Sequence, residues 1–135
     1  MSRGKQDNQQ GDPDTTIQEL KDLIAQFAAE RDWERHHTPK NLALSISIEA
    51  AELLEHFQWD EYHQDDKEAM ASELADILAY AFNFANVMDI DVASAFRKKL
   101  EKVNKKYPVE IFNKNNVGKD DFFRIKKEYR KKGKS

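Results

Sequence analysis

Apolar residues spaced three and four positions apart recur along most of this chain, and residues that favour turns are scarce. The 135 residues include four Gly and three Pro, whereas Ala, Leu, Glu and Lys are plentiful. This pattern favours long helices with few turns. No segment alternates apolar and polar residues convincingly enough to predict a strand. We therefore expect an all-α protein, and its length suits one domain with a modest core.

Four helices joined by short connections are expected. The first is expected over about 16–31, where Thr16 and Glu19 form a capping-box pattern. The second is expected over about 41–57 and the third over about 67–88, with the polar loop DEYHQDD between them. Asp91 is the expected N-cap of a fourth helix, which stops before Pro108. This arrangement predicts a four-helix bundle.

Composition divides the chain into three segments. Residues 1–15 are polar and expected to be disordered, residues 16–112 form the domain, and residues 113–135 form a basic tail. Residues 1–113 carry 13 Lys or Arg against 22 Asp or Glu, whereas 114–135 carry nine against three. The acidic body argues against a nucleic-acid partner, because it would repel the phosphate backbone. We interpret the tail as a solvated extension, with a functional arm as the alternative.

Several classes of protein are excluded by what the sequence lacks. Without Cys there are no disulfides, thiolate metal sites or Cys nucleophiles. No apolar run approaches the roughly 18 residues of a membrane span, and the N-terminal segment has no apolar signal core. We therefore expect a soluble cytoplasmic protein without a membrane partner.

Two pairs of carboxylates border the apolar stripes of consecutive expected helices. In the second helix, Glu49 and Glu52 lie beside the stripe that begins with Leu42 and Ile46. In the third helix, Glu73 and Asp76 repeat the same spacing of three residues. Tyr80 and Asn83 continue this face at intervals of about one turn.

Four carboxylates close together need a counter-charge, because like charges and desolvation both oppose ionisation. A divalent metal supplies it, and an all-oxygen ligand set favours Mg²⁺ or Mn²⁺. A di-iron bundle is disfavoured, because it would place His where Glu52 and Asp76 stand. From spacing alone, four solvated surface carboxylates remain an equal alternative to a metal site.

The order of these motifs resembles that of the MazG-like all-α nucleoside triphosphate pyrophosphohydrolases, and in particular the short dCTP pyrophosphatase type. Four stretches carry the resemblance: FAAERDW at 27–33, EHFQW at 55–59, ELADILAY at 73–80 and KKYPVE at 105–110. The resemblance implies Mg²⁺-dependent hydrolysis of an NTP or dNTP, with dCTP as a candidate, to the monophosphate and pyrophosphate. It also implies a homo-oligomer, either a dimer or a dimer of dimers, which would be a homotetramer.

The resemblance also implies roles for individual residues. Metal binding and catalysis fall to Glu49, Glu52, Glu73 and Asp76. Substrate contacts fall to the following residues: Trp33, Trp59, Tyr80, Asn83, Lys99, Asn104, Lys106 and Tyr107. Val103 stands where the family has Asn, and Ile24 stands where dCTP-specific members have His, so the base preference is left open. The alternative function is a non-catalytic helical binding module that uses the acidic face and the basic tail.

Overall fold

The computed structural model describes residues 10–59, 67–115 and 119–133, and every regular element in these ranges is helical. This confirms the all-α prediction. Five α-helices are described where four were expected: α1 (Ile17–Glu30), α2 (Pro39–Glu55), α3 (Lys67–Val87), α4 (Val92–Lys106) and α5 (Lys119–Lys131). A 3-10 turn, η1 (Glu34–His36), precedes α2. The loop expected over 60–66 and most of the segment expected to be disordered lie outside the described residues.

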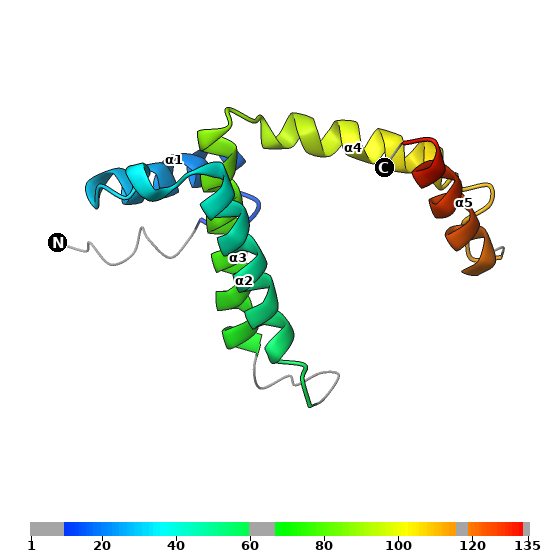
Figure 1. Cartoon of the computed structure of the whole chain (residues 1–135), viewed down its shortest axis with the longest axis horizontal. Helices are drawn as coiled ribbons and strands as arrows, with labels where there is room; N and C mark the ends of the chain where they lie inside the picture. The colour runs from blue at the N-terminus through cyan, green and yellow to red at the C-terminus, as the bar shows by residue number, and fades with distance from the viewer. Residues whose placement is uncertain (1–9, 60–66, 116–118, 134–135) are drawn as a thin grey trace. The chain divides into compact units, whose positions relative to one another are not determined.

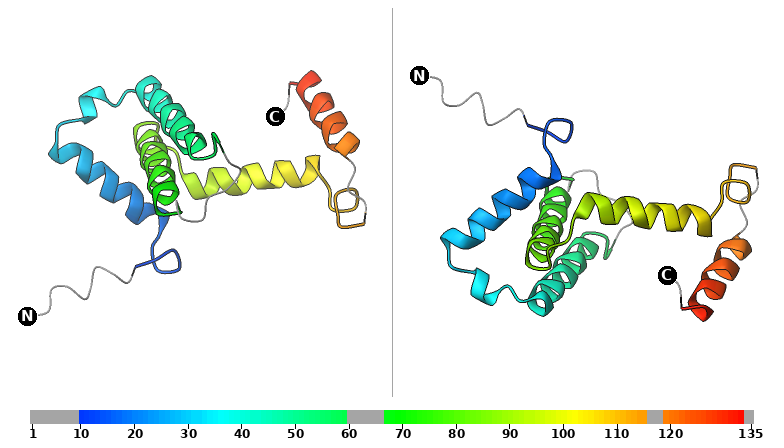
Figure 2. Two further views of the ribbon diagram at one scale, coloured as in Figure 1. Left: turned by 90° about the horizontal axis from the view of Figure 1, so that it is seen from below. Right: turned by 90° about the horizontal axis from the view of Figure 1, so that it is seen from above.

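The chain divides into two compact units, residues 1–91 and 92–135. In the first unit, α2 and α3 lie side by side and antiparallel, and α1 packs against α3 (Figure 1). Further views of the same helices agree with this arrangement (Figure 2). None of the helices in the described part of the chain is long and apolar enough to cross a membrane.

The N-terminus of α1 has the capping box that the sequence predicted. The Thr16 hydroxyl accepts a hydrogen bond from the Glu19 backbone at 3.1 Å, and the Glu19 carboxylate accepts one from the Thr16 backbone at 2.7 Å. Together they satisfy two of the backbone N–H groups that the first turn of a helix leaves unpaired. The start of α1 is therefore defined by local interactions alone.

Two helices of the first unit end in the same way, with an Asp in the left-handed region. Asp32 follows α1 and Asp89 follows α3, each with φ of 52°. The amide of Trp33 donates to the Ala28 carbonyl at 3.0 Å, and the amide of Ile90 donates to the Ala85 carbonyl at 2.9 Å. This is the hydrogen-bond pattern of a Schellman motif. The motif turns the chain sharply at the end of α1 and thereby fixes the backbone position of Trp33.

The first unit has a small core and a large amount of exposed apolar surface. Among the described residues of this unit, the buried apolar side chains are Ala28, Leu42 and Ala85, with Leu42 only 1% exposed. Other large apolar residues stay open to solvent, including Leu23, which is 62% exposed. Residues of α1 and α3 line an apolar groove of about 480 Å³: Leu20, Leu23, Ile24, Phe27, Ala75, Leu78, Ala79 and Phe82.

The second unit contains a helix that sequence analysis did not expect. The segment interpreted as a solvated tail includes the 13-residue helix α5, in which Ile125 is 8% exposed. Its aromatic residues contact the end of α4, because the Phe122 ring stacks on the Tyr107 ring at 5.2 Å between centroids. The signal was present, because Phe122, Ile125 and Tyr129 recur at helical spacing, but the many Lys and Arg residues around them favoured the interpretation as a solvated tail.

We expect Thr16→Ala to lower the free energy of unfolding by about 1 kcal/mol, because it removes the capping hydroxyl. Urea denaturation followed by circular dichroism measures this change. The neighbouring Thr15→Val is the matched control, since the Thr15 hydroxyl is buried and has no hydrogen-bond partner among residues 10–59, 67–115 and 119–133. Its removal should cost nothing. Equal losses in the two variants would contradict the capping role.

Candidate metal and nucleotide site

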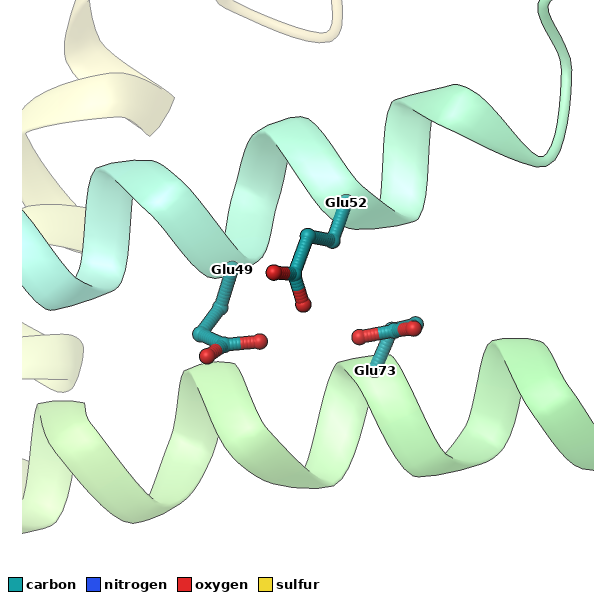
Figure 3. Close-up of side chains that lie close together, drawn as sticks. All are labelled: Glu49, Glu52 and Glu73. Atoms are coloured by element: carbon teal, nitrogen blue, oxygen red, sulfur yellow. The ribbon is translucent and has the colours of Figure 1, made fainter.

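Three carboxylates from α2 and α3 meet where these helices pack together. Glu49 and Glu52 lie one turn apart on α2, and Glu73 faces them from α3 (Figure 3). Each offers one oxygen within 4.8 Å of those of the other two, and all three side chains are half-buried. Because α2 and α3 are antiparallel neighbours, residues far apart in sequence are held in one cluster.

The cluster makes ionisation of Glu49 unfavourable. The pKa of Glu49 is raised from 4.5 to about 7, first by a hydrogen bond with Glu52, which requires a shared proton, and then by desolvation. The negative charges of Glu52, Asp76 and Glu73 raise the pKa further. At neutral pH the metal-free cluster therefore retains a proton for part of the time.

One oxygen of Glu49 lacks any partner within the described chain. Its Oε2 atom is buried and accepts no hydrogen bond. A buried carboxylate oxygen without a donor is costly, and a bound cation would satisfy it. Three oxygen donors at short range suit a hard divalent ion such as Mg²⁺. The donor set thus fits the metal that the sequence predicted.

Asp76 and His56 lie at the edge of this cluster. Asp76 does not belong to the group of three, and its side chain is exposed, yet its charge contributes to the raised pKa of Glu49. His56 Nε2 lies 3.6 Å from Glu73 Oε1, which is beyond hydrogen-bond distance but close enough for an ion pair when the imidazole is protonated. We had not singled out His56 as part of the site. The signal was present, because His56 follows Glu52 by four residues and so shares its helix face.

The four predicted substrate residues of the first unit occupy different environments. Asn83 is buried at 7% exposure and lines a cavity of about 200 Å³ together with His37 and Asn86. Trp33 packs edge-on against Phe27, with ring centroids 5.5 Å apart, and stays partly exposed. Tyr80 is half-buried on α3, and Trp59, just after α2, is 87% exposed. The described residues do not gather these four side chains into one pocket.

The other four predicted substrate residues lie in the second unit. Lys99, Asn104 and Lys106 are in α4, and Tyr107 directly follows it. Asn104 and Tyr107 line a cavity of about 560 Å³ in the second unit, with Pro108 and Phe112 among its other walls. Lys106 and Tyr107 are half-buried. Two of the four therefore share a hollow that could accept part of a ligand.

The sequence matches a known protein family and several named relatives. The sequence model of the MazG-like family matches residues 44–129, which include all four predicted metal ligands and most of the second unit. The chain is 35% identical over 107 residues to dCTP pyrophosphatase 1 of Rattus norvegicus, covering 73% of this chain and 63% of the relative. It is 38% identical over 104 residues to dCTP pyrophosphatase 1 of Bos taurus, covering 71% of this chain and 62% of the relative. The match thus spans less than two thirds of these relatives.

A solved structure has the same fold. The crystal structure of a pyrophosphatase from Archaeoglobus fulgidus aligns with a TM-score of 0.62 and 42% sequence identity. The alignment covers 68% of this chain and 92% of that one. The extent of the family match and the identity to these relatives lead to one conclusion: this chain belongs to the MazG-like family.

Proposed function

We propose that this chain is a Mg²⁺-dependent nucleotide pyrophosphohydrolase that cleaves an NTP or dNTP to the monophosphate and pyrophosphate. The observation that carries the proposal is the cluster of Glu49, Glu52 and Glu73, in which one buried Glu49 oxygen has no donor in the described part of the chain. A site of concentrated negative charge attracts a divalent cation, and Mg²⁺ shares its coordination shell with substrate phosphates. Mn²⁺ has the same ligand preference.

The choice of bond and substrate rests on the relatives rather than on the carboxylates, which would suit cleavage at either phosphate anhydride. The rat and bovine relatives are named for dCTP and pyrophosphatase activity. We therefore take dCTP as the first candidate substrate and pyrophosphate as the expected product.

Each part of the carboxylate site has a distinct chemical task in this proposal. When bound, the metal neutralises phosphate charge and lowers the pKa of a coordinated water. Glu49, Glu52, Glu73 and Asp76 would hold it, and one of these carboxylates would orient or deprotonate the attacking water. His56 lies beside this site, with its Nε2 atom 3.6 Å from Glu73 Oε1. Water would be the nucleophile, so the α–β anhydride bond would break as the bond to the water oxygen forms, and no covalent intermediate with a protein side chain is needed.

A panel of NTPs and dNTPs with Mg²⁺, scored separately for pyrophosphate and orthophosphate, tests the reaction. We expect pyrophosphate without orthophosphate, and a loss of at least about a hundredfold in Glu49→Gln and Asp76→Asn, because each removes charge from the site with little change of shape. Glu55→Gln, at the exposed C-terminal residue of α2, is the matched control and should retain activity. Near-normal rates in Glu49→Gln, or direct release of orthophosphate, would contradict the assignment.

The raised pKa of Glu49 predicts how stability depends on pH and metal. Because its folded pKa of about 7 exceeds the ordinary 4.5, its contribution to stability is complete below pH 4.5 and is lost as pH rises through 7. The metal-free protein should therefore lose thermal stability between pH 5.5 and 8. Mg²⁺ should restore it more strongly at pH 8 than at pH 5.5, since at low pH binding must displace a proton.

Thermal unfolding with EDTA or Mg²⁺ at the two pH values measures both effects. Glu49→Gln should lose most of the pH-dependent difference and of the Mg²⁺ response, whereas Glu55→Gln should keep both. A Mg²⁺ response that is unchanged in Glu49→Gln would argue against a metal at this cluster. This readout is independent of catalysis.

The exposed apolar surface of the first unit supports the predicted homo-oligomer. We propose that a second copy covers the groove between α1 and α3, because four of its eight lining residues are large apolar side chains that solvent otherwise reaches: Leu20, Leu23, Phe27 and Leu78. A surplus of this kind marks an interaction surface. A two-fold axis would make the contact reciprocal, and a dimer of dimers is the larger assembly consistent with it. Trp33, next to this groove through its Phe27 contact, is the candidate for reaching a neighbouring site.

Leu23→Glu should dissociate the assembly at micromolar concentration, because it places a charge in the covered groove. Light scattering after size exclusion measures the mass. Gln18→Glu adds the same charge elsewhere on α1, where the side chain is exposed, and should leave the mass unchanged. A wild-type monomer with full activity would refute both the interface and a shared site.

The cytoplasmic location expected from the sequence stays a prediction.

A further inference from the structure

We propose that helix α5 positions two substrate-binding residues, Lys106 and Tyr107, through the rings of Phe122 and Tyr129. The inference rests on the proposed function, because it concerns how the nucleotide is bound. Neither the sequence pattern nor the geometry of the carboxylate site indicates this role for α5.

The Tyr107 ring is held between two aromatic side chains. Phe122 of α5 stacks on it nearly parallel, at 5.2 Å and 14°. Phe112 meets it nearly perpendicular, at 5.3 Å and 88°. Offset stacking and edge-to-face contact are the two favourable geometries for aromatic pairs. Two contacts of different geometry restrict both the tilt and the position of the Tyr107 ring.

The ammonium group of Lys106 is held by two rings as well. Its Nζ atom lies 5.4 Å from the centroid of Tyr107 and 5.1 Å from that of Tyr129, which belongs to α5. Both distances are within the range of cation–π attraction. A lysine side chain ordinarily loses considerable rotamer freedom when it binds a phosphate. Restricting Lys106 in advance lowers that cost, which is the general advantage of preorganisation.

Backbone geometry explains why this arrangement forms at the end of α4. The Tyr107 amide donates to the Val103 carbonyl at 2.8 Å, so the residue still continues the helical hydrogen bonding. After Pro108 the chain turns, and the amides of Ile111 and Phe112 both donate to the Pro108 carbonyl, at 3.0 and 2.9 Å. This turn brings Phe112 back to the Tyr107 ring.

The ring cluster also forms one wall of a cavity. Asn104, Tyr107 and Phe112 line the hollow of about 560 Å³, whereas no residue of α5 does. Phe122 therefore affects this cavity through Tyr107, by fixing the ring that forms its wall. A side chain that acts in this way is a positioning residue. It should alter how tightly nucleotide binds and leave the chemical step unchanged.

Two neighbouring phenylalanines provide a matched comparison in the full-length protein. Phe122→Leu keeps apolar volume but loses the stacked face, and should raise KM about threefold to tenfold with kcat within about twofold. Phe122→Tyr keeps the ring and should restore the wild-type KM. Phe123 is 63% exposed, and its ring contacts that of Phe122 edge-on. It supplies the control Phe123→Leu, whose KM should not change.

A double-mutant cycle separates positioning from a structural role. If Phe122 acts through Tyr107, Phe122→Leu should have little further effect on KM in a Tyr107→Leu background. The same increase in both backgrounds would overturn the inference. So would an unchanged KM in Phe122→Leu. A lowered KM would overturn it too, and would mean that Phe122 covers a ring face that the nucleotide needs.

Binding of a non-hydrolysable α,β-imido dNTP by calorimetry provides a second readout that does not need turnover. We expect Phe122→Leu to raise the dissociation constant of this analogue by the same factor of about three to ten. Its helical content, measured by circular dichroism, should not change. A wild-type protein that binds this analogue but releases no pyrophosphate from dNTPs would refute the proposed reaction alone. A wild-type protein that binds no nucleotide would overturn both proposals.

Discussion

The gathering of Glu49, Glu52 and Glu73 between α2 and α3 is the main constraint on the first unit. Their oxygens lie within 4.8 Å of one another, and the Glu52 hydrogen bond, desolvation and the neighbouring negative charges raise the pKa of Glu49 to about 7. One Glu49 oxygen is buried without a donor among the described residues. Packing between α2 and α3 must supply the free energy that keeps them together. The fully buried Leu42 contributes to it from α2, two turns before Glu49. Structural stability is thus used to hold a site that is unfavourable in the absence of a cation.

The first unit has only a small core to offset the cost of holding these carboxylates together. Few apolar side chains of its described residues are buried, and the groove between α1 and α3 remains open to solvent. A chain that holds mutually repelling charges and leaves its apolar surface exposed gains from association with a second copy. The metal and the partner copy would each offset one of these costs, since both bind only the folded state.

In the second unit, aromatic rings contact the side chains of Lys106 and Tyr107, and α5 supplies two of these rings. In our proposal these contacts order two flexible side chains before a nucleotide binds. The charged residues that led us to interpret this segment as a solvated tail occupy the same helix as the rings. The basic composition is a property of the exposed face of α5. It gave no indication of the aromatic face that packs.

Sequence alone determined the elements whose causes are local. Helical spacing predicted α1 to α4, the Thr16 capping box was found as expected, and the spacing of Glu49 with Glu52 followed from the helix period. The tertiary structure decided which carboxylates meet: Glu73 joins the pair from α2, Asp76 stays at the edge, and His56 approaches Glu73. These contacts depend on how α2 and α3 are rotated against each other. Helix rotation and the pairing of α5 with Tyr107 are set by packing between distant residues, which hydrophobic periodicity along one segment does not specify.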